Sequence, residues 1–156
     1  MSPARYLHDS RFQVPGDERE VQAPFRRGRW DVRVLHSPKD LLGWALLYAR
    51  HARVNIERDR LWEAEYYATG FRNYALSVAC AHRNLPALYG KGLEDLPRDV
   101  VDSFQPALVR SFDRDELSRA LEAGLTALSK DLRRDKPLDP KLQARIDELI
   151  APSKER

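Results

Sequence analysis

The chain has 156 residues, of which 42% are hydrophobic and 33% are charged; this suits one globular domain and excludes a disordered chain. Lysine and arginine number 27 against 24 aspartates and glutamates, a net charge of +3. Because these cations are spread along the chain, we do not expect it to bind nucleic acid. No apolar run approaches the roughly 18 residues of a membrane span. The N-terminus resembles no secretory signal, and Cys80 has no disulfide partner, so we expect a cytoplasmic protein.

Residues 1–36 form a segment rich in proline and glycine, which favour turns. Within it, RFQV and WDVRVLH alternate between apolar and polar residues, as short β-strands do. We expect an irregular N-terminal arm over 1–36, with these two stretches as its candidate strands. The second part of the chain, 37–152, has the periodicity of helices.

The first helix begins at Ser37, a good N-cap that is followed by a proline and, three residues later, by Asp40. One face has apolar residues at helical spacing from Leu41 to Ile56, and the helix ends near residues 57–59. Trp44, Leu47 and Tyr48 widen the apolar face. The pattern therefore predicts a helix that is covered on more than one side.

Further helices are predicted at about 60–82 and at 98–104, with a glycine-containing loop between them. Asp113 and Glu116 form a capping pattern before a leucine-rich helix that extends to about Leu132. Asp139, followed by proline, begins a terminal helix. The sum is an all-α fold: an antiparallel four- to five-helix bundle that follows the N-terminal arm.

Two acidic residues, Glu63 and Glu65, stand in the aromatic block WEAEYY of the second helix. At helical spacing Glu63 shares a ridge with Tyr67 and Tyr74 at the edge of the core face, whereas Glu65 shares a polar flank with Arg72. Because the two carboxylates point to different sides, they do not form the pair of an acid–base mechanism. We therefore assign no catalytic residue.

Both glutamates have a structural and a functional interpretation. Glu65 and Arg72 fit a solvated charge flank. Glu63 either bonds a tyrosine hydroxyl or a buried arginine, or gives an aromatic pocket the negative charge that suits a small cationic ligand. The candidate substrate-binding residues are thus Glu63, Glu65, Tyr67, Arg72 and Tyr74.

The first helix carries a second candidate set, Arg50, His51 and Arg53. These residues form either a solvated face or a contact with a partner or its phosphates. Cys80 fits a small helix residue better than a nucleophile, since no histidine–aspartate pattern accompanies it. The sequence has no phosphate-binding glycine loop, no HExxH motif and no Cys/His cluster, so we expect no metal and no cofactor.

Several blocks in order resemble a known family: WEAEYY, the Arg72–Asn73 pair, YGKGLEDLP and LVRSFDRDELSRAL. Together they are similar to the C-terminal helical domain of bacterial nucleotidyltransferases, the polymerase-β-like enzymes that include the aminoglycoside nucleotidyltransferases. The similarity extends from about His51 to Leu132. It implies a helical domain that covers an active-site cleft and helps to bind the acceptor, in some relatives through a carboxylate that acts as general base. Glu63 and Glu65 are the positions to which that role transfers.

In that family the catalytic domain binds nucleotide with a Gly-Ser loop and holds magnesium on a D-x-[DE] pair. This chain has no Gly-Ser dipeptide, and its Asp113–Asp115 stretch caps a helix. The resemblance therefore implies a protein that is inactive alone: an acceptor-binding or accessory domain that works with a catalytic nucleotidyltransferase domain or chain.

Two alternatives stay open. Wide apolar helix faces are also typical of a homodimeric interaction module that needs no ligand. Related helical domains also occur in stand-alone ribonuclease toxins, which place arginine and histidine on one helix with four to six residues between them. Arg72 and His82 have nine residues between them, and a pair with the right spacing, Arg29 and His36, falls in the N-terminal arm.

Overall fold

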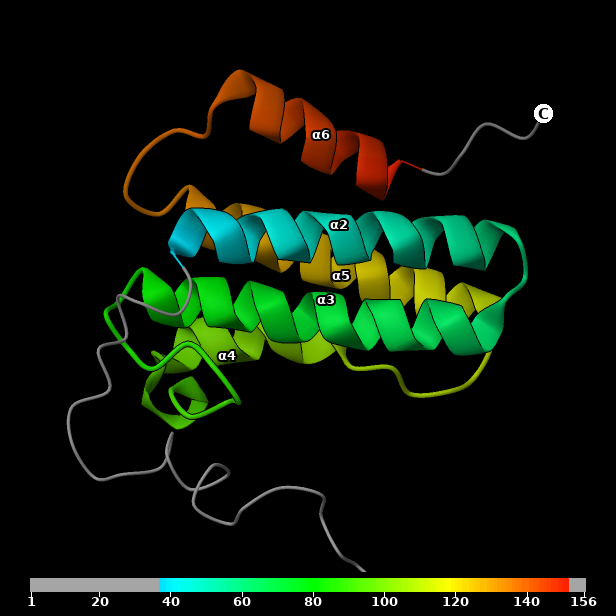
Figure 1. Cartoon of the computed structure of the whole chain (residues 1–156), viewed down its shortest axis with the longest axis horizontal. Helices are drawn as coiled ribbons and strands as arrows, with labels where there is room; N and C mark the ends of the chain where they lie inside the picture. Colours follow the sequence, from blue (N-terminus) through cyan, green and yellow to red (C-terminus); the bar gives the residue numbers. More distant parts are fainter. Residues whose placement is uncertain (1–36, 152–156) are drawn as a thin grey trace, which may run out of the picture. The chain divides into compact units, whose positions relative to one another are not determined.

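Helices make up most of residues 37–151, the part of the chain that the computed structural model describes (Figure 1). The α-helices are α2 (Pro38–Glu57), α3 (Leu61–Ala81), α4 (Arg98–Phe104), α5 (Arg114–Leu132) and α6 (Pro140–Ile150), and the short 3₁₀ helices are η3 (Leu93–Asp95) and η4 (Gln105–Ala107). The described part contains no strand, which confirms the all-α fold class. The strands predicted within 1–36 lie outside the described residues.

Side-chain caps begin three of the helices, as the sequence predicts. The hydroxyl of Ser37 accepts a hydrogen bond from the Asp40 amide at 3.1 Å, and Asp113 accepts one from the Glu116 amide at 2.8 Å. Asp139 accepts bonds from the first two amides of α6. Each cap stabilises its helix by about 1 kcal/mol, which fixes where α2, α5 and α6 start.

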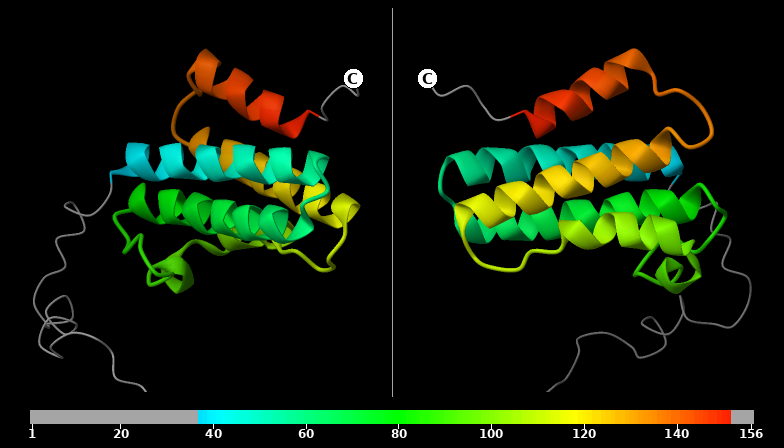
Figure 2. Two further views of the ribbon diagram at one scale, coloured as in Figure 1. Left: turned by 45° about the vertical axis from the view of Figure 1, so that its right-hand side comes forward. Right: turned by 180° about the vertical axis from the view of Figure 1, so that it is seen from behind.

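The long helices lie side by side (Figures 1 and 2). The chain reverses between α2 and α3, so these two helices are antiparallel and form the most extensive helix pair. Helix α5 packs on both and runs in the same direction as α3: Trp62 at the start of α3 contacts Phe112 just before α5, and Arg83 after α3 pairs with Asp131 near the end of α5. The short helix α4 and its flanking loops return the chain between them.

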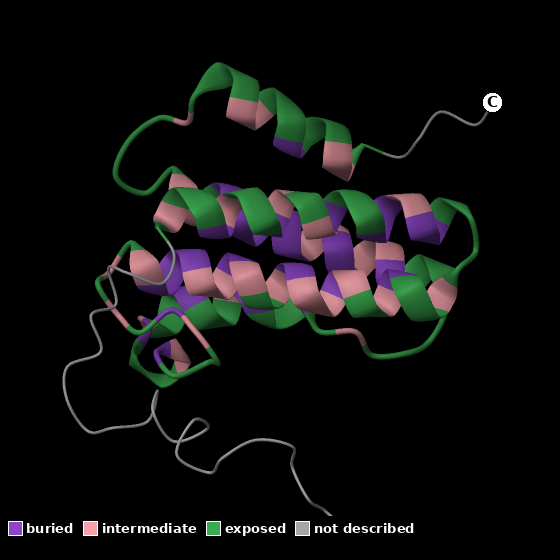
Figure 3. Cartoon of the chain, viewed as in Figure 1, coloured by how far each residue is buried: buried purple, intermediate pink, exposed green. Residues whose placement is uncertain are grey.

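The core lies where α2, α3 and α5 meet (Figure 3). Alanines dominate the facing sides of α2 and α3, and small side chains allow two helices to approach closely. Larger residues from α3 and α5 fill the remaining space, and α6 adds one fully buried side chain. The fully buried residues include Ala45, Ala49, Ala52, Ala64, Ala75, Phe71, Leu117, Leu121, Leu125, Leu128 and Ile146.

Helix α2 is covered on more than one side, as predicted, because α3, α5 and α6 all pack against it. Of the three residues that widen its apolar face, Tyr48 is half-buried, and the other two are exposed. Trp44 and Leu47 remain 46% and 41% exposed, whereas Leu41 and Ile56 are buried as predicted. Apolar periodicity identifies the apolar side chains of a helix, but it does not show whether another element covers them.

Among residues 37–151, no helix combines the length and apolar character that crossing a bilayer requires. The cytoplasmic location stays a prediction.

Candidate functional site

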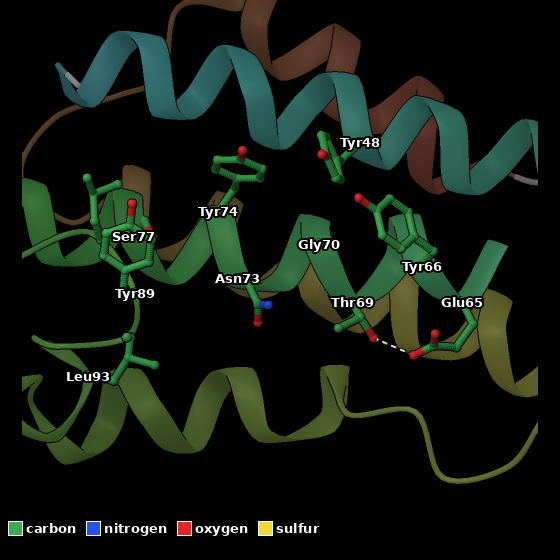
Figure 4. A pocket seen from close by; sticks show the side chains of 12 residues that line it. Tyr48, Glu65, Tyr66, Thr69, Gly70, Asn73, Tyr74, Ser77, Tyr89 and Leu93 are labelled. Atoms are coloured by element: carbon green, nitrogen blue, oxygen red, sulfur yellow. Dashed lines mark hydrogen bonds between the residues drawn. The ribbon is translucent and has the colours of Figure 1, made fainter. Parts of the chain in front are cut away.

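An open cleft of about 620 Å³ lies between α3, α2 and the loop that follows α3 (Figure 4). Tyrosines from all three elements contribute to it, together with one carboxylate and several neutral polar groups. The lining residues are Tyr48, Glu65, Tyr66, Thr69, Gly70, Asn73, Tyr74, Ser77, Leu88, Tyr89, Gly90 and Leu93. We call this space the tyrosine cleft.

A glycine in the middle of α3 makes room for the innermost ring. A Cβ atom on Gly70 would lie 2.5 Å from one carbon of the Tyr48 ring and 2.6 Å from another, well inside van der Waals contact. Tyr48 can therefore lie directly on the backbone of α3 only because residue 70 has no side chain. This contact brings a tyrosine of α2 into the wall of a cleft that α3 mainly forms.

Aromatic rings form a continuous cluster around Tyr48. Its ring centre lies 5.0 Å from that of Tyr74 and 5.3 Å from that of Tyr67, both edge to face, and 6.4 Å from that of Tyr66. Trp44 stacks on Tyr74 at one end of the cluster. Edge-to-face pairs at these distances stabilise by about 1 kcal/mol each, so the rings hold one another in position.

Glu65 carries the only formal charge among the lining residues of the tyrosine cleft. Its Oε1 atom accepts a 2.7 Å hydrogen bond from the Thr69 hydroxyl one turn later, which orients the carboxylate on the helix surface (Figure 4). Burial raises the pKa of Tyr48, and the neighbouring phenols of Tyr66 and Tyr74 raise it further. The phenol of Tyr48 is thus neutral at neutral pH, and the cleft is anionic through Glu65.

Glu63, expected among the tyrosines, lies outside this cleft. Its side chain is 55% exposed and forms an ion pair with Arg60 at 3.5 Å. The prediction that the two glutamates point to different flanks is correct, but it assigned the aromatic environment to the wrong one. Glu63 is on the same side of α3 as Tyr67, as predicted. It lies one turn nearer to the start of the helix, beside the connection between α2 and α3 that contains Arg60.

The other predicted substrate-binding residues divide between neighbouring places. Tyr74 lines the tyrosine cleft. Tyr67 does not line it, but packs against Tyr48 and stacks on the exposed ring of His51 at 4.8 Å. Arg72 lines a second cleft on the α4 side of α3 and donates a 3.1 Å hydrogen bond to Asn73.

Of the residues predicted to contact a partner or phosphate, Arg53 has a different role. Only 8% of Arg53 is exposed, and its guanidinium donates to the Leu149 carbonyl oxygen at 2.7 Å and to the Ser118 hydroxyl at 3.0 Å. It also forms an ion pair with Glu122 at 3.4 Å. Arg53 therefore links α2 to α5 and α6. Because its guanidinium is buried and occupied by these groups, it is not available for a phosphate contact. Arg50 is exposed on α2.

Cys80 has the environment of a packed core residue. It is buried, and burial raises the pKa of its thiol to about 11, so the thiolate that a nucleophile needs is scarce at neutral pH. Arg72 and His82, the pair considered for a ribonuclease, line different clefts and are not brought together. Within residues 37–151, no group of three or more histidine, cysteine or acidic side chains is placed to hold a metal.

The sequence interpretation missed Tyr48, Tyr66 and Tyr89 as cleft residues. The signal that could have found the first is Gly70, because a glycine inside a strongly helical pattern often marks a close approach by another element. Tyr89 lies in the loop after α3 and has a positive φ of 57°, a backbone conformation that helical periodicity cannot predict.

The chain matches no protein family model, no curated protein and no solved structure.

Proposed function

We propose that the chain is a helical binding domain whose tyrosine cleft takes a small organic cation. The observation that carries the proposal is the position of Glu65, a single carboxylate in a cleft with four tyrosines and no lysine, arginine or histidine in its lining. An ammonium group is attracted by the faces of aromatic rings and by a carboxylate, and this cleft offers both.

Glu65 and the tyrosine rings line the same cleft. Tyr66 follows Glu65 directly in α3, and the ring of Tyr48 lies 6.4 Å from that of Tyr66, across the groove between α2 and α3. Cation–π attraction contributes about 0.5–2 kcal/mol, increasing as the cation loses water. The cleft is open, so the expected affinity for a simple ammonium compound is weak, with a Kd on the order of 1 mM.

Binding describes this site better than catalysis. Thr69 donates to Glu65, and the lining provides no second acid and no histidine to act as a proton-transfer partner. One carboxylate among tyrosines can orient an amine and lower the cost of its desolvation.

Together with the resemblance to nucleotidyltransferase C-terminal domains, the cleft supports a more specific proposal. The chain would supply the acceptor-binding part of such an enzyme, with a catalytic nucleotidyltransferase domain or chain as its partner. Aminoglycoside acceptors carry several ammonium groups and fit an anionic aromatic cleft. Mixing the chain with a candidate catalytic partner should give a complex at micromolar concentration by size-exclusion chromatography; separate elution would count against this version.

The proposed cation site is tested by calorimetric titration with octylamine and with an aminoglycoside. Glu65→Gln keeps the size of the side chain but removes its charge, and should weaken binding about tenfold. Glu63→Gln is the matched control, because it removes an equal charge from the same helix outside the cleft. Equal losses in both variants would show that only the general charge of α3 matters, and the proposal would then be wrong.

A homodimeric interaction module is the second candidate. The observation that favours it is the exposure of Trp44 and Leu47, which stand one turn apart on α2. A second copy of the chain could cover them. Light scattering over a range of concentrations should show a dimer that Leu47→Ser weakens; a monomer at every concentration would exclude this candidate.

A further inference from the structure

Helix α3 has two opposite charges on one side, Glu65 and Arg72. Glu65 and Arg72 are seven residues apart, which is almost two complete helical turns. Both side chains therefore leave α3 on the same side, and their α-carbons are separated by about 10.5 Å along the helix axis. No ion pair joins them within 4 Å, and each has one side-chain hydrogen bond, Glu65 with Thr69 and Arg72 with Asn73.

Arg72 lines a second cleft of about 640 Å³ that adjoins the tyrosine cleft. Asn73 and Leu93 belong to the walls of both, so the two clefts are neighbouring parts of one groove along α3. In Figure 4 the side chain of Asn73 leaves α3 on the side away from α2. The wall of the second cleft is mainly apolar: Leu76, Leu93, Leu96, Val101, Phe104 and Leu108.

The guanidinium of Arg72 is little used by the fold. It donates one hydrogen bond, to the Asn73 side-chain oxygen, although a guanidinium has five N–H donors. Its pKa is lowered by burial, while the charge of Glu65 opposes that shift. Arg98, the other cation of this cleft, is paired with Asp102 at 3.8 Å and is almost fully exposed. Arg72 is thus a half-buried cation with donors left for an anion.

We infer that the natural ligand is dipolar, with an ammonium group at Glu65 and a carboxylate at Arg72, joined by an apolar spacer that lies on the shared wall of the two clefts. This inference rests on the proposed function of the tyrosine cleft and extends it to a second anchor. A carboxylate fits better than a phosphate, because Glu94 and Asp102 also line the second cleft and would repel a doubly charged group.

The test compares three ligands on the full chain by isotope-edited NMR titration. Octylamine has the ammonium group and the spacer, ω-aminooctanoate adds the distal carboxylate, and ω-aminobutyrate carries both charges but is too short to reach both anchors. A charge-assisted hydrogen bond to arginine should make ω-aminooctanoate bind about tenfold more tightly than octylamine. Arg72→Gln should abolish the advantage of ω-aminooctanoate over octylamine, whereas the matched variant Arg98→Gln should retain it.

The outcomes separate this inference from the proposed function. Suppose that octylamine binds but ω-aminooctanoate binds no more tightly, or that ω-aminooctanoate still binds more tightly in the Arg72→Gln variant. Either result rules out the dipolar ligand but leaves the cation site in place. If ω-aminobutyrate binds as much more tightly than octylamine as ω-aminooctanoate does, the two-anchor geometry is wrong. If octylamine does not bind at all, both the cation site and its extension are overturned.

Discussion

Charged side chains in two regions of the molecule differ in how many hydrogen bonds they make with the rest of the chain. At the junction of α2, α5 and α6, the guanidinium of Arg53 is buried and is occupied by carbonyl oxygens, a hydroxyl and a carboxylate of the same chain. On the outer stripe of α3, Glu65 and Arg72 have one side-chain hydrogen bond each, and both line open clefts.

Structural charges and charges available for binding differ in how much of their hydrogen-bonding capacity the fold uses. A charge that the fold uses has its hydrogen-bonding capacity filled from within, as at Arg53. A charge that is half-buried and keeps unused capacity in a cleft can bind a ligand without disrupting the core. By this criterion the proposed ligand site lies on α3, whereas Arg53 at the α2–α5–α6 junction has a structural role.

The largest expected effect comes from removing the structural charge. Arg53→Met deletes the guanidinium and leaves the carbonyl oxygens near the end of α6 without their donor, so the free energy of unfolding should fall by about 2–3 kcal/mol. Arg72→Met is the matched variant and should change stability by no more than about 0.5 kcal/mol. Urea denaturation followed by circular dichroism measures both. Equal losses would erase the distinction between the two regions.

Two glycines give the next test, because they occupy helices with different surroundings. Gly70→Ala places a methyl group against the Tyr48 ring and should destabilise the protein by about 1–3 kcal/mol. Gly43→Ala, on α2, meets no atom within 4 Å and should stabilise the protein by about 0.5–1 kcal/mol through helix propensity. Thermal unfolding compares them; a neutral Gly70→Ala would show that the tyrosine cleft is not held by this contact.

A smaller effect depends on pH and concerns another charge that the fold uses. Glu116 accepts hydrogen bonds from the Arg119 guanidinium and from the Arg110 amide, which together hold its pKa at about 2, below the ordinary value of 4.5. Its stabilising contribution is therefore complete above pH 4.5 and is lost as the pH falls toward 2. The stability difference between the wild type and Glu116→Gln should shrink over that range. A difference that is constant with pH would contradict this account of Glu116.

Much of the fold follows from local signals. The caps at Ser37, Asp113 and Asp139 and the apolar periodicity predict where α2, α5 and α6 begin, and α4 occupies the predicted residues 98–104. Local signals could not show that α3 and α5 run in the same direction, because that depends on how α4 and the loops beside it return the chain.

The site was only partly predictable for the same reason. Helical spacing placed Glu65 and Arg72 on one flank of α3. It could not show that Glu65 lines a cleft with α2 and the loop after α3, or that Arg72 lines a second cleft with η3 and α4. It equally could not show that Arg53 reaches the end of α6, a contact across 96 residues of sequence. Partners that are distant in sequence decide whether a charge is structural or available.

Locating a bound cation by NMR tests directly whether the tyrosine cleft binds one. Intermolecular nuclear Overhauser effects should connect the methyl protons of tetramethylammonium with ring protons of Tyr48, Tyr66 and Tyr74, and Glu65→Gln should abolish them while Glu63→Gln leaves them unchanged. Contacts with the exposed Trp62 and Phe112 rings instead, or equal contacts in the Glu65→Gln variant, would contradict the assignment of the tyrosine cleft as the ligand site.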